Sequence, residues 1–294
     1  MSGRWQLAGR WVILTGGTGG IGLAALEQLA GSGAKLAVVG RNPSRLAEAT
    51  ERLNRLGADT VLGFQADLTL LSEVRTLAEE LAEKVPDPAV LVNNAGAIFA
   101  RFALTAEGHE RTWALNHLAP FLLTNLLLER LKAVAPAKVI TTSSDAHRGA
   151  RLDLERIDGP DGFGFAGFGR YSQTKLANIL FTAELARRLE GSGVGAYCFH
   201  PGFVATGFNR NNGALASLLM TAARPFARSP QDGARTLVWL VERPPEELQS
   251  GGYYYDQRVR EPARAAQDRK LAAALWRLSA AQAGLGSPEG GDGR

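Results

Sequence analysis

The stretch Thr15-Gly-Gly-Thr-Gly-Gly-Ile-Gly22 follows a short apolar run at 11–14 and precedes LAALEQLAGSG, whose apolar residues recur at helical spacing. A strand, a glycine turn and a helix in this order direct backbone N–H groups and a helix N-terminus at a phosphate. Two spacings fit: Gly17, Gly19 and Gly22 match G-x-G-x-x-G, whereas Gly16, Gly20 and Gly22 match T-G-x-x-x-G-x-G. The alternative is a flexible glycine turn without a ligand.

Alternating strand and helix patterns continue after this turn. Further strands are expected at 35–39, 60–66, 89–92, 138–142 and 194–199, with helices at 42–56, 70–84 and 106–131. Because short connections join these units, they predict an α/β fold of the Rossmann type, a doubly wound parallel sheet with helices on both faces. Ligands of such sheets bind at the carboxyl ends of the strands. The glycine turn, Asn93, Ser144 and Pro201 are all expected there.

A single domain is expected to span residues 1–283. It would close with a helix at 230–242, a last strand at 252–256 and an amphipathic helix at 262–281. Residues 284–294 are rich in glycine and predict a disordered tail.

The composition is that of a soluble globular protein. Of 294 residues, 45% are apolar and 21% charged, and the net charge of +4 is spread without a basic run, so a nucleic-acid partner is not expected. The one cysteine, Cys198, excludes a disulfide framework. No apolar stretch reaches about 18 residues, and the N-terminus lacks a signal-peptide core, so we expect no membrane span and a cytoplasmic location. His147 and His200 lack metal-ligand spacing, so no metal is expected.

The end of the second expected strand bears on cofactor choice. An NAD site usually has an acidic residue here for the ribose hydroxyls, whereas this chain has Gly40 followed by Arg41. A cation at this point suits a 2′-phosphate, which favours NADP over NAD, and Arg45 could assist. The alternative is that Arg41 is a solvated loop charge. Asp67, after the third strand, either receives the adenine amino group or caps the next helix.

Polar residues follow the next two strands. The segment Asn93-Asn94-Ala95-Gly96 contains small residues that let the backbone lie close to a ribose. Asn116 interrupts a largely apolar helical pattern and requires a partner, a water or a function. The fifth strand leads into Ser143-Ser144. Each signal is weak alone.

Tyr171 and Lys175 stand four residues apart in a segment with helical spacing. On a helix, the phenol and the ammonium would lie on one face, a turn apart. A neighbouring cation lowers the pKa of a phenol from its usual value of about 10. The pair therefore predicts a general acid that can protonate a developing alkoxide. The alternative is a packed aromatic beside a solvated lysine.

These motifs, taken in order, resemble the short-chain dehydrogenase/reductase family. The matching segments are TGGTGGIG, Asp67-Leu68, NNAG, Asn116, Ser144, Tyr171 with Lys175, and Pro201-Gly202 followed by Thr206, and they span nearly the whole chain. Within the family, the chain is most similar to the retinol dehydrogenase and WW-domain oxidoreductase branch. The residues that carry this likeness are SSDAH at 143–147, YSQTKLANILF at 171–181, HPGFVAT at 200–206, and GGYYYD and LWRLS nearer the C-terminus.

The resemblance implies a role for each matched residue. Tyr171 would be the acid–base residue, and Lys175 would lower its pKa and hold the nicotinamide ribose. Ser144, preferred to Ser143 by position, would donate to the substrate carbonyl, and Asn116 would hold a water that links Lys175 to solvent. The predicted cofactor site comprises Thr15, Gly16, Gly17, Thr18, Gly20, Ile21, Gly22, Arg41, Asp67, Leu68, Asn94, Ala95, Gly96, Tyr171, Lys175, Pro201, Gly202, Val204 and Thr206.

Two segments elaborate the family pattern. The interval 145–170 is longer than usual and contains GPDGFGFAGFG, which is either a wall with Phe163, Phe165 and Phe168 facing substrate or a flexible insertion. It could also obstruct the helix pairing by which many members associate, so a monomer and a homodimer both stay open. Residues 203–228 would form the substrate loop. In that loop, Leu215, Leu218, Leu219 and Met220 predict an apolar flap or a packed helix.

Three functions remain in view. The first is an NADP(H)-dependent reductase or dehydrogenase that acts on a carbonyl or alcohol carbon of an apolar small molecule. The second is a non-catalytic dinucleotide-binding scaffold or sensor. The third is a sugar-nucleotide epimerase or dehydratase, whose glycine spacing fits Gly16, Gly19 and Gly22, although about ninety residues after Pro201 leave little room for its larger C-terminal domain.

Overall fold

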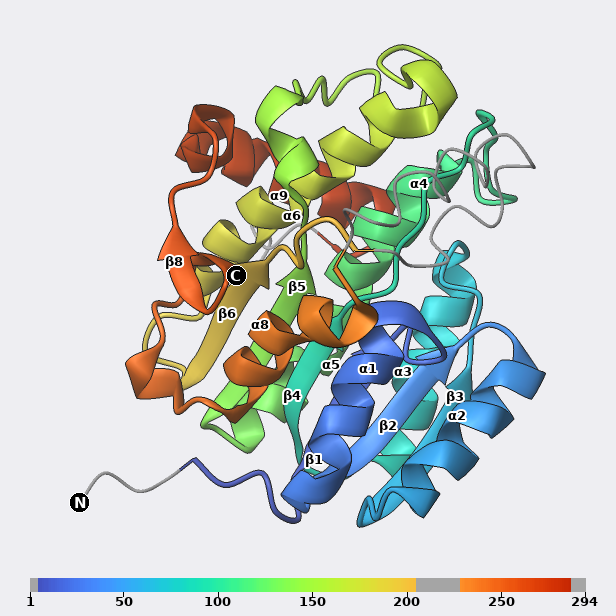
Figure 1. The fold of residues 1–294 in the computed structure, drawn as a ribbon. Helices are drawn as coiled ribbons and strands as arrows, with labels where there is room; N and C mark the ends of the chain where they lie inside the picture. Colours follow the sequence, from blue (N-terminus) through green and yellow to red (C-terminus); the bar gives the residue numbers. More distant parts are fainter. Residues whose placement is uncertain (1–4, 205–227, 287–294) are drawn as a thin grey trace, which may run out of the picture.

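The computed structural model describes residues 5–204 and 228–286, and a single eight-stranded sheet runs through them (Figure 1). Its strands are β1 (Trp11–Thr15), β2 (Lys35–Gly40), β3 (Thr60–Gln65), β4 (Pro88–Asn93), β5 (Ala137–Thr142), β6 (Val194–Phe199), β7 (Tyr253–Tyr255) and β8 (Arg258–Arg260). Their spatial order is β3-β2-β1-β4-β5-β6-β7-β8. All neighbouring pairs are parallel except β7 and β8. The predicted doubly wound α/β fold is confirmed.

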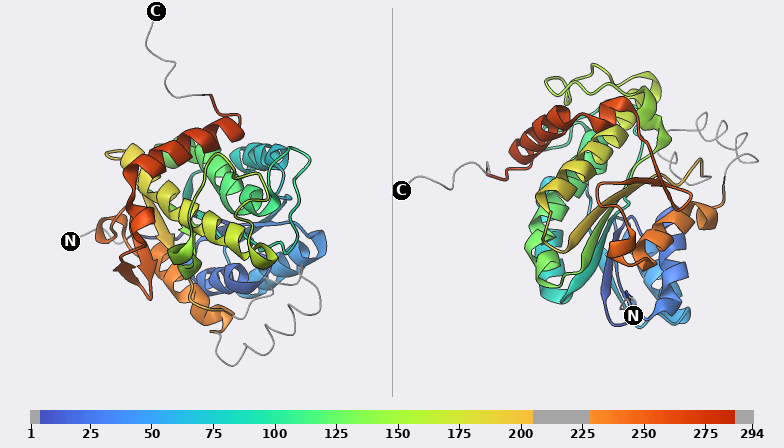
Figure 2. Two further views of the ribbon diagram at one scale, coloured as in Figure 1. Left: turned by 90° about the horizontal axis from the view of Figure 1, so that it is seen from above. Right: turned by 90° about the vertical axis from the view of Figure 1, so that its left-hand side faces the viewer.

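Helices cover both faces of the sheet, so the fold has three layers: helices, sheet and helices (Figure 2). On one face lie α1 (Gly20–Leu29), α2 (Pro43–Arg55) and α8 (Pro230–Glu242); on the other lie α3 (Leu71–Lys84), α5 (Ala119–Ala133), α6 (Phe168–Arg188) and α9 (Arg269–Gln282). Successive strand residues point to opposite faces of the sheet. Val12 and Leu14 therefore pack on the side of α1 and α8, whereas Ile13 packs on the side of α3, α5, α6 and α9. Strands buried on both faces explain why the sequence shows continuous apolar runs rather than alternation.

The predicted helix at 106–131 begins later and is not uniform. Gly108 has a left-handed φ of 85°, and the Glu110 carboxylate accepts the Trp113 N–H, so the helix starts with α4 (Arg111–Trp113). A π-helical turn at Ala114–Leu118 then precedes α5, and it contains Asn116. Such turns are frequent at functional sites.

The C-terminal part also differs from the prediction. The expected strand at 252–256 is the shorter β7, and β8 was missed because its Arg-Val-Arg sequence is exposed and lacks an apolar face. Asp256 and Gln257 join the two strands with positive φ, as a tight hairpin requires. The expected helix at 262–281 divides into a 3-10 turn at Arg264–Gln267 and α9, which Asp268 caps.

Some predictions concern residues that the structure does not describe. Most of the substrate loop, at 205–227, and the end of the tail, at 287–294, lie outside the described residues. Across 5–204 and 228–286, no helix combines the length and the apolar character needed to cross a membrane.

Candidate active site

The glycine turn connects β1 to α1 at the carboxyl edge of the sheet. Gly16 has a φ of 72°, and a Cβ placed on it would lie 2.9 Å from the Cα of Ala95. A Cβ on Gly22 would overlap the carbonyl oxygen of Gly16. Gly20 has a φ of 54°, whereas Gly19 is extended and faces open space. Positive φ or crowding by backbone atoms marks Gly16, Gly20 and Gly22, which favours the spacing T-G-x-x-x-G-x-G.

The N-terminus of α1 fits an anion. Gly19 provides no side-chain cap, and the first turn of the helix contains no acidic residue. Within residues 5–204 and 228–286, no side chain caps the N–H groups of that turn, and no atom crowds Gly19, so a ligand can approach them. This cradle fits the pyrophosphate of a dinucleotide.

Thr15 and Asn94 tie the turn to β4. The Thr15 hydroxyl donates to the Val92 carbonyl (3.2 Å) and accepts the N–H groups of Asn94 (3.0 Å) and Ala95 (3.1 Å). The Asn94 amide donates back to the Thr15 carbonyl (3.0 Å). These two predicted cofactor residues thus use their side chains to shape the turn.

The other predicted residues of the turn have separate surroundings. A Cβ on Gly17 would meet core side chains of Leu26 and Val38 at 2.7 Å, and Thr18 lies against Gly40. Ile21 and Val204 both approach Gly233 of α8. The Leu68 side chain lies in the hydrophobic core.

Arg41 and Asp67 lie together beyond β2 and β3. Arg41 Nη1 is 3.6 Å from Asp67 Oδ2, and both side chains reach the surface. Asp67 Oδ1 accepts the N–H and the hydroxyl of Thr69 (3.0 and 2.8 Å). The interpretation that Asp67 caps the next helix is wrong, because Glu107 accepts the first two N–H groups of α3 (2.6 and 2.9 Å).

Tyr171 and Lys175 lie on one face of α6. The ammonium is 5.3 Å from the centre of the phenol ring and donates to the Thr142 carbonyl (3.2 Å). A Cβ on Gly96 would lie 3.6 Å from that ammonium, and the neighbouring Ala95 touches the glycine turn at Gly16. The structure therefore brings the expected acid–base pair and the expected phosphate turn to the same edge of the sheet.

The pKa values of the pair follow from burial. Burial raises the pKa of Tyr171 to about 12, against the opposite effect of its side-chain hydrogen bond to Ser144. Burial lowers the pKa of Lys175 to about 8. The predicted net fall in the tyrosine pKa is not seen, because burial of the phenol dominates and raises that pKa. A phenol protonated at neutral pH is suited to donate a proton.

The two serines after β5 have different partners. Ser144 hydrogen-bonds to Tyr171, and its hydroxyl also accepts the N–H of Ala146 (3.3 Å). Ser143 is buried and donates to the main-chain carbonyl of Lys175 (2.7 Å). The geometry favours Ser144 as the serine that meets a substrate. His147 holds the main chain of Ser144. Its Nε2 accepts the Ala263 N–H (3.1 Å), so its Nδ1 carries the proton and donates to the Ser144 carbonyl (2.8 Å).

Asn116 is fully buried and bonded through its whole side chain. Its amide donates to the Ala97 carbonyl (2.9 Å) and the Thr174 hydroxyl (3.2 Å), and its Oδ1 accepts the Ala97 N–H (2.9 Å). Its main-chain carbonyl accepts the Asn178 amide (2.9 Å). A water linked to Lys175 would therefore have to use the second lone pair of that carbonyl. Sequence reasoning missed Asn178, although its spacing places it on the face of Tyr171 and Lys175.

The segment after β6 crosses the same edge. His200 stacks on Tyr255 at 4.1 Å, accepts the Gly202 N–H (3.1 Å) and has a pKa lowered by burial to about 4. These contacts fix the Pro201-Gly202 turn, where Gly202 has a φ of 82°. Val204 then pairs with residue 228 as an isolated bridge. Thr206 and the proposed flap residues lie outside the described residues.

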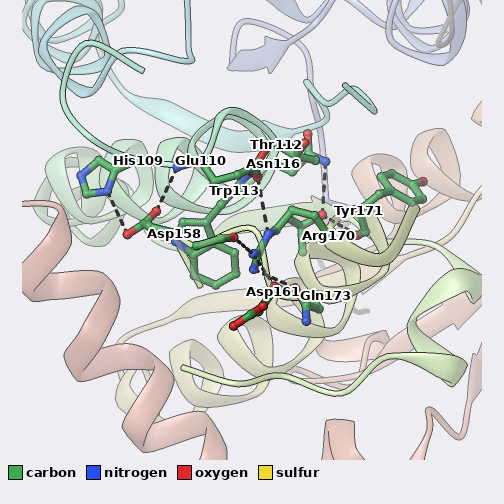
Figure 3. A network of polar contacts seen from close by, with 12 residues as sticks. His109, Glu110, Thr112, Trp113, Asn116, Asp158, Asp161, Arg170, Tyr171 and Gln173 are labelled. Atoms are coloured by element: carbon green, nitrogen blue, oxygen red, sulfur yellow. Dashed lines mark hydrogen bonds and ion pairs between the residues drawn. The ribbon is translucent and has the colours of Figure 1, made fainter. Parts of the chain in front are cut away.

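A buried polar network anchors the long interval before Tyr171 (Figure 3). Arg170 donates to the side chain of Gln173 (2.8 Å) and to the carbonyls of Gly159 (2.8 Å) and Asp161 (3.1 Å). Its Nε is 3.7 Å from the Glu110 carboxylate, with side-chain exposures of 1% and 0%. Arg170 thus ties the main chain of Gly159 and Asp161 to the first turn of α6, while most side chains between them stay exposed.

Aromatic side chains of this interval lie exposed beside the candidate acid. Phe168 is 55% exposed, and its ring centre is 6.1 Å from that of Tyr171. Phe165 is 92% exposed, while Phe163 packs edge-on against Phe102 at 5.8 Å. Exposed aromatic side chains gathered beside Tyr171 favour an apolar contact surface there.

Comparisons with known proteins agree with this arrangement. A family model described as short chain dehydrogenase matches residues 10–154. A Streptomyces protein (strain C5) named as a candidate daunorubicin C-13 ketoreductase is 41% identical over 278 residues, which cover 95% of this chain and 94% of that one. Retinol dehydrogenase 12 of Mus musculus is 36% identical over 284 residues, covering 95% and 88%.

Solved structures show the same fold. A protein from Mycobacterium paratuberculosis superposes with a TM-score of 0.76 at 32% identity, covering 96% of both chains. A short chain dehydrogenase from Burkholderia cenocepacia J2315, in complex with NADP, has a TM-score of 0.67 at 26% identity and covers 84% of this chain and 96% of its own.

Proposed function

Because the chain belongs to the short-chain dehydrogenases, with retinol dehydrogenases among its relatives, we propose that it oxidises or reduces an apolar small molecule with NADP(H). The observation that carries this proposal is the meeting of Tyr171, Lys175 and Ser144 with the glycine turn, through Ala95 and Gly96. The bound dinucleotide supplies or takes the hydride. The residues of the chain supply the proton and the geometry.

In the reducing direction, Tyr171 gives its proton to the carbonyl oxygen as negative charge grows there. Its pKa near 12 keeps the phenol protonated until that moment. Ser144 holds the same oxygen by a hydrogen bond that strengthens as the charge develops. The nearby Lys175 ammonium stabilises the phenolate that remains. In the oxidising direction the same groups act in reverse.

Two observations support the finer assignments. Arg41 follows β2, where NAD sites carry an acid, and its exposed guanidinium suits a 2′-phosphate; a structural relative was crystallised with NADP. Exposed Phe165 and Phe168 beside Tyr171 suit an apolar substrate. The names of the relatives, which refer to a ketoreductase and to retinol, agree with reaction at a carbonyl or alcohol carbon.

The test is NADPH consumption over a panel of aldehydes and ketones, run beside Tyr171→Phe. We expect turnover of apolar carbonyls and a fall in kcat of about 10²–10⁴-fold in the variant. Equal rates in the variant would remove the assigned acid. Tight NADPH binding without turnover of any compound would instead support a dinucleotide-binding sensor.

A further inference from the structure

A buried asparagine connects two carbonyls at the candidate active site. Asn178 lies on α6, three residues after Lys175 and seven after Tyr171, on the same helix face. Its Nδ2 donates to the main-chain carbonyls of Asn116 (2.9 Å) and Thr142 (3.2 Å). The Thr142 carbonyl also accepts the Lys175 ammonium. Asn178 and Lys175 therefore share one acceptor.

The chain of contacts continues to the C-terminal helix. Asn178 Oδ1 is 3.3 Å from Nδ1 of His117, and Nε2 of His117 is 2.8 Å from the Ser279 hydroxyl on α9. All three side chains are at most 2% exposed. A polar network among buried side chains is costly unless every member is bonded.

The direction of each hydrogen bond follows from the partners. Both groups that face Nδ2 of Asn178 are carbonyls, so this atom must be the nitrogen and Oδ1 must face His117. An amide oxygen only accepts, so Nδ1 of His117 carries the ring proton. Burial lowers the pKa of His117 to about 4, so the ring is neutral and Nε2 accepts from Ser279. The histidine thus fixes the amide of Asn178 in one orientation.

Aromatic rings hold His117 in place. Its ring centre is 4.3 Å from that of Trp113 and 6.3 Å from those of Phe121 and Phe181. The ring therefore cannot turn to offer its other nitrogen without repacking this layer. A rigid histidine is a suitable support for the asparagine.

We propose, resting on the function proposed above, that Asn178 is a positioning residue for proton transfer and that His117 and Ser279 fix its amide. Asn178 supplies a donor to two buried carbonyls, and one of them, that of Thr142, also accepts the Lys175 ammonium. Without Asn178, the Thr142 carbonyl would lack that donor and would draw the ammonium toward it. The ammonium would then move away from Tyr171, which it must stabilise as the phenolate.

The test compares Asn178→Ala with the unchanged enzyme at saturating cofactor and substrate. We expect kcat to fall about tenfold, a fraction of what a positioned acid–base group contributes, with KM and NADPH affinity within about twofold. The pH at which alcohol oxidation reaches half its maximal rate is expected to rise, because the phenolate loses stabilisation. Ser279→Ala and His117→Phe are expected to move that pH in the same direction by less.

A matched control removes a buried hydrogen bond of the same helix that does not involve the Asn178 side chain. Thr182 is buried and donates to the main-chain carbonyl of Asn178 (2.8 Å), so Thr182→Val should lower stability but leave the pH profile unchanged. An unchanged profile in folded Asn178→Ala, or in Ser279→Ala if the first variant does not fold, overturns the inference while Tyr171-dependent turnover keeps the proposed function. Full turnover in Tyr171→Phe defeats both.

Discussion

At the scale of single residues, burial decides the chemistry of Tyr171 and Lys175 more than their spacing does. The four-residue spacing correctly predicted that both side chains share a helix face. It could not predict that burial would raise the pKa of the phenol to about 12 and lower that of the ammonium to about 8. In the described part of the chain no carboxylate pairs with Lys175, and a buried cation without such a partner is maintained at a cost in stability.

This cost predicts that Lys175→Met stabilises the protein while it abolishes activity. The unfolded lysine keeps its proton to about pH 10.5, whereas the folded lysine releases it at about pH 8. The cost of burying the charged form is therefore complete below about pH 8. We expect a gain of up to about 3 kcal/mol in unfolding free energy at pH 7. The gain should shrink between about pH 8 and 10.5, where the folded lysine is already neutral. Urea unfolding of both proteins at pH 7 and at about pH 10.5 measures this gain.

The exposed Lys84 provides the control for that experiment. Lys84→Met should change the unfolding free energy by less than about 0.5 kcal/mol at either pH. A Lys175→Met variant less stable than the natural protein at pH 7 would show that the ammonium is better compensated than its surroundings indicate.

Arg41 carries the prediction about cofactor choice. Arg41→Asp should lower the NADPH-to-NADH preference in kcat/KM by about tenfold to hundredfold, because it replaces a cation at the 2′-phosphate position with an anion. Arg55→Asp, at the far end of α2, makes the same change in net charge and should leave the preference within about twofold. A preference unaltered by Arg41→Asp would assign the arginine to its surface pair with Asp67.

At the scale of elements, the segment before α6 depends on Arg170. Its guanidinium bonds to Gly159, Asp161 and Gln173 and faces the buried Glu110 (Figure 3). Removal of one partner from a buried ion pair typically costs about 3–5 kcal/mol, because the other charge stays buried. We expect Arg170→Met to lose that much unfolding free energy, as measured by urea unfolding at neutral pH.

A second arginine of the same segment serves as the comparison. Arg156 pairs with Asp161 at 3.1 Å, with both side chains 67% exposed, so Arg156→Ala should cost at most about 1 kcal/mol. Equal losses in the two variants would mean that the segment is not held by its buried charge.

The same elements show what a sequence can and cannot predict. Continuous apolar runs and the glycine turn predicted β1 to β6 and the parallel sheet, because these signals are local. The π-helical turn at Asn116 and the exposed strand β8 were not predictable, since neither changes the apolar pattern. Arg170 and Asn178 were missed for a related reason: their partners are brought together only by the fold. Ser144 was chosen by position, and the contacts of Ser143 with Lys175 support that choice.

At the scale of the whole molecule, α9 covers the layer formed by α5 and α6 (Figure 2). Trp276 of α9 lies with its ring centre 4.9 Å from that of Phe121 and 5.9 Å from that of Phe181, and Arg188 stacks over it at 4.3 Å. The apolar face of α5 and α6 is thereby covered by the C-terminal helix of the same chain.

We therefore expect the full chain to be a monomer of 31.3 kDa by light scattering over about a tenfold range of concentration. Trp276→Ala should cost about 3–5 kcal/mol and loosen α9, so that part of the apolar layer becomes free to associate. The variant is then expected to form dimers or larger species, whereas Val259→Ala, a change of an exposed apolar residue on β8, should stay monomeric. A natural protein that is already a stable dimer, with Trp276 still protected from quenching, would place the pairing surface elsewhere on the molecule.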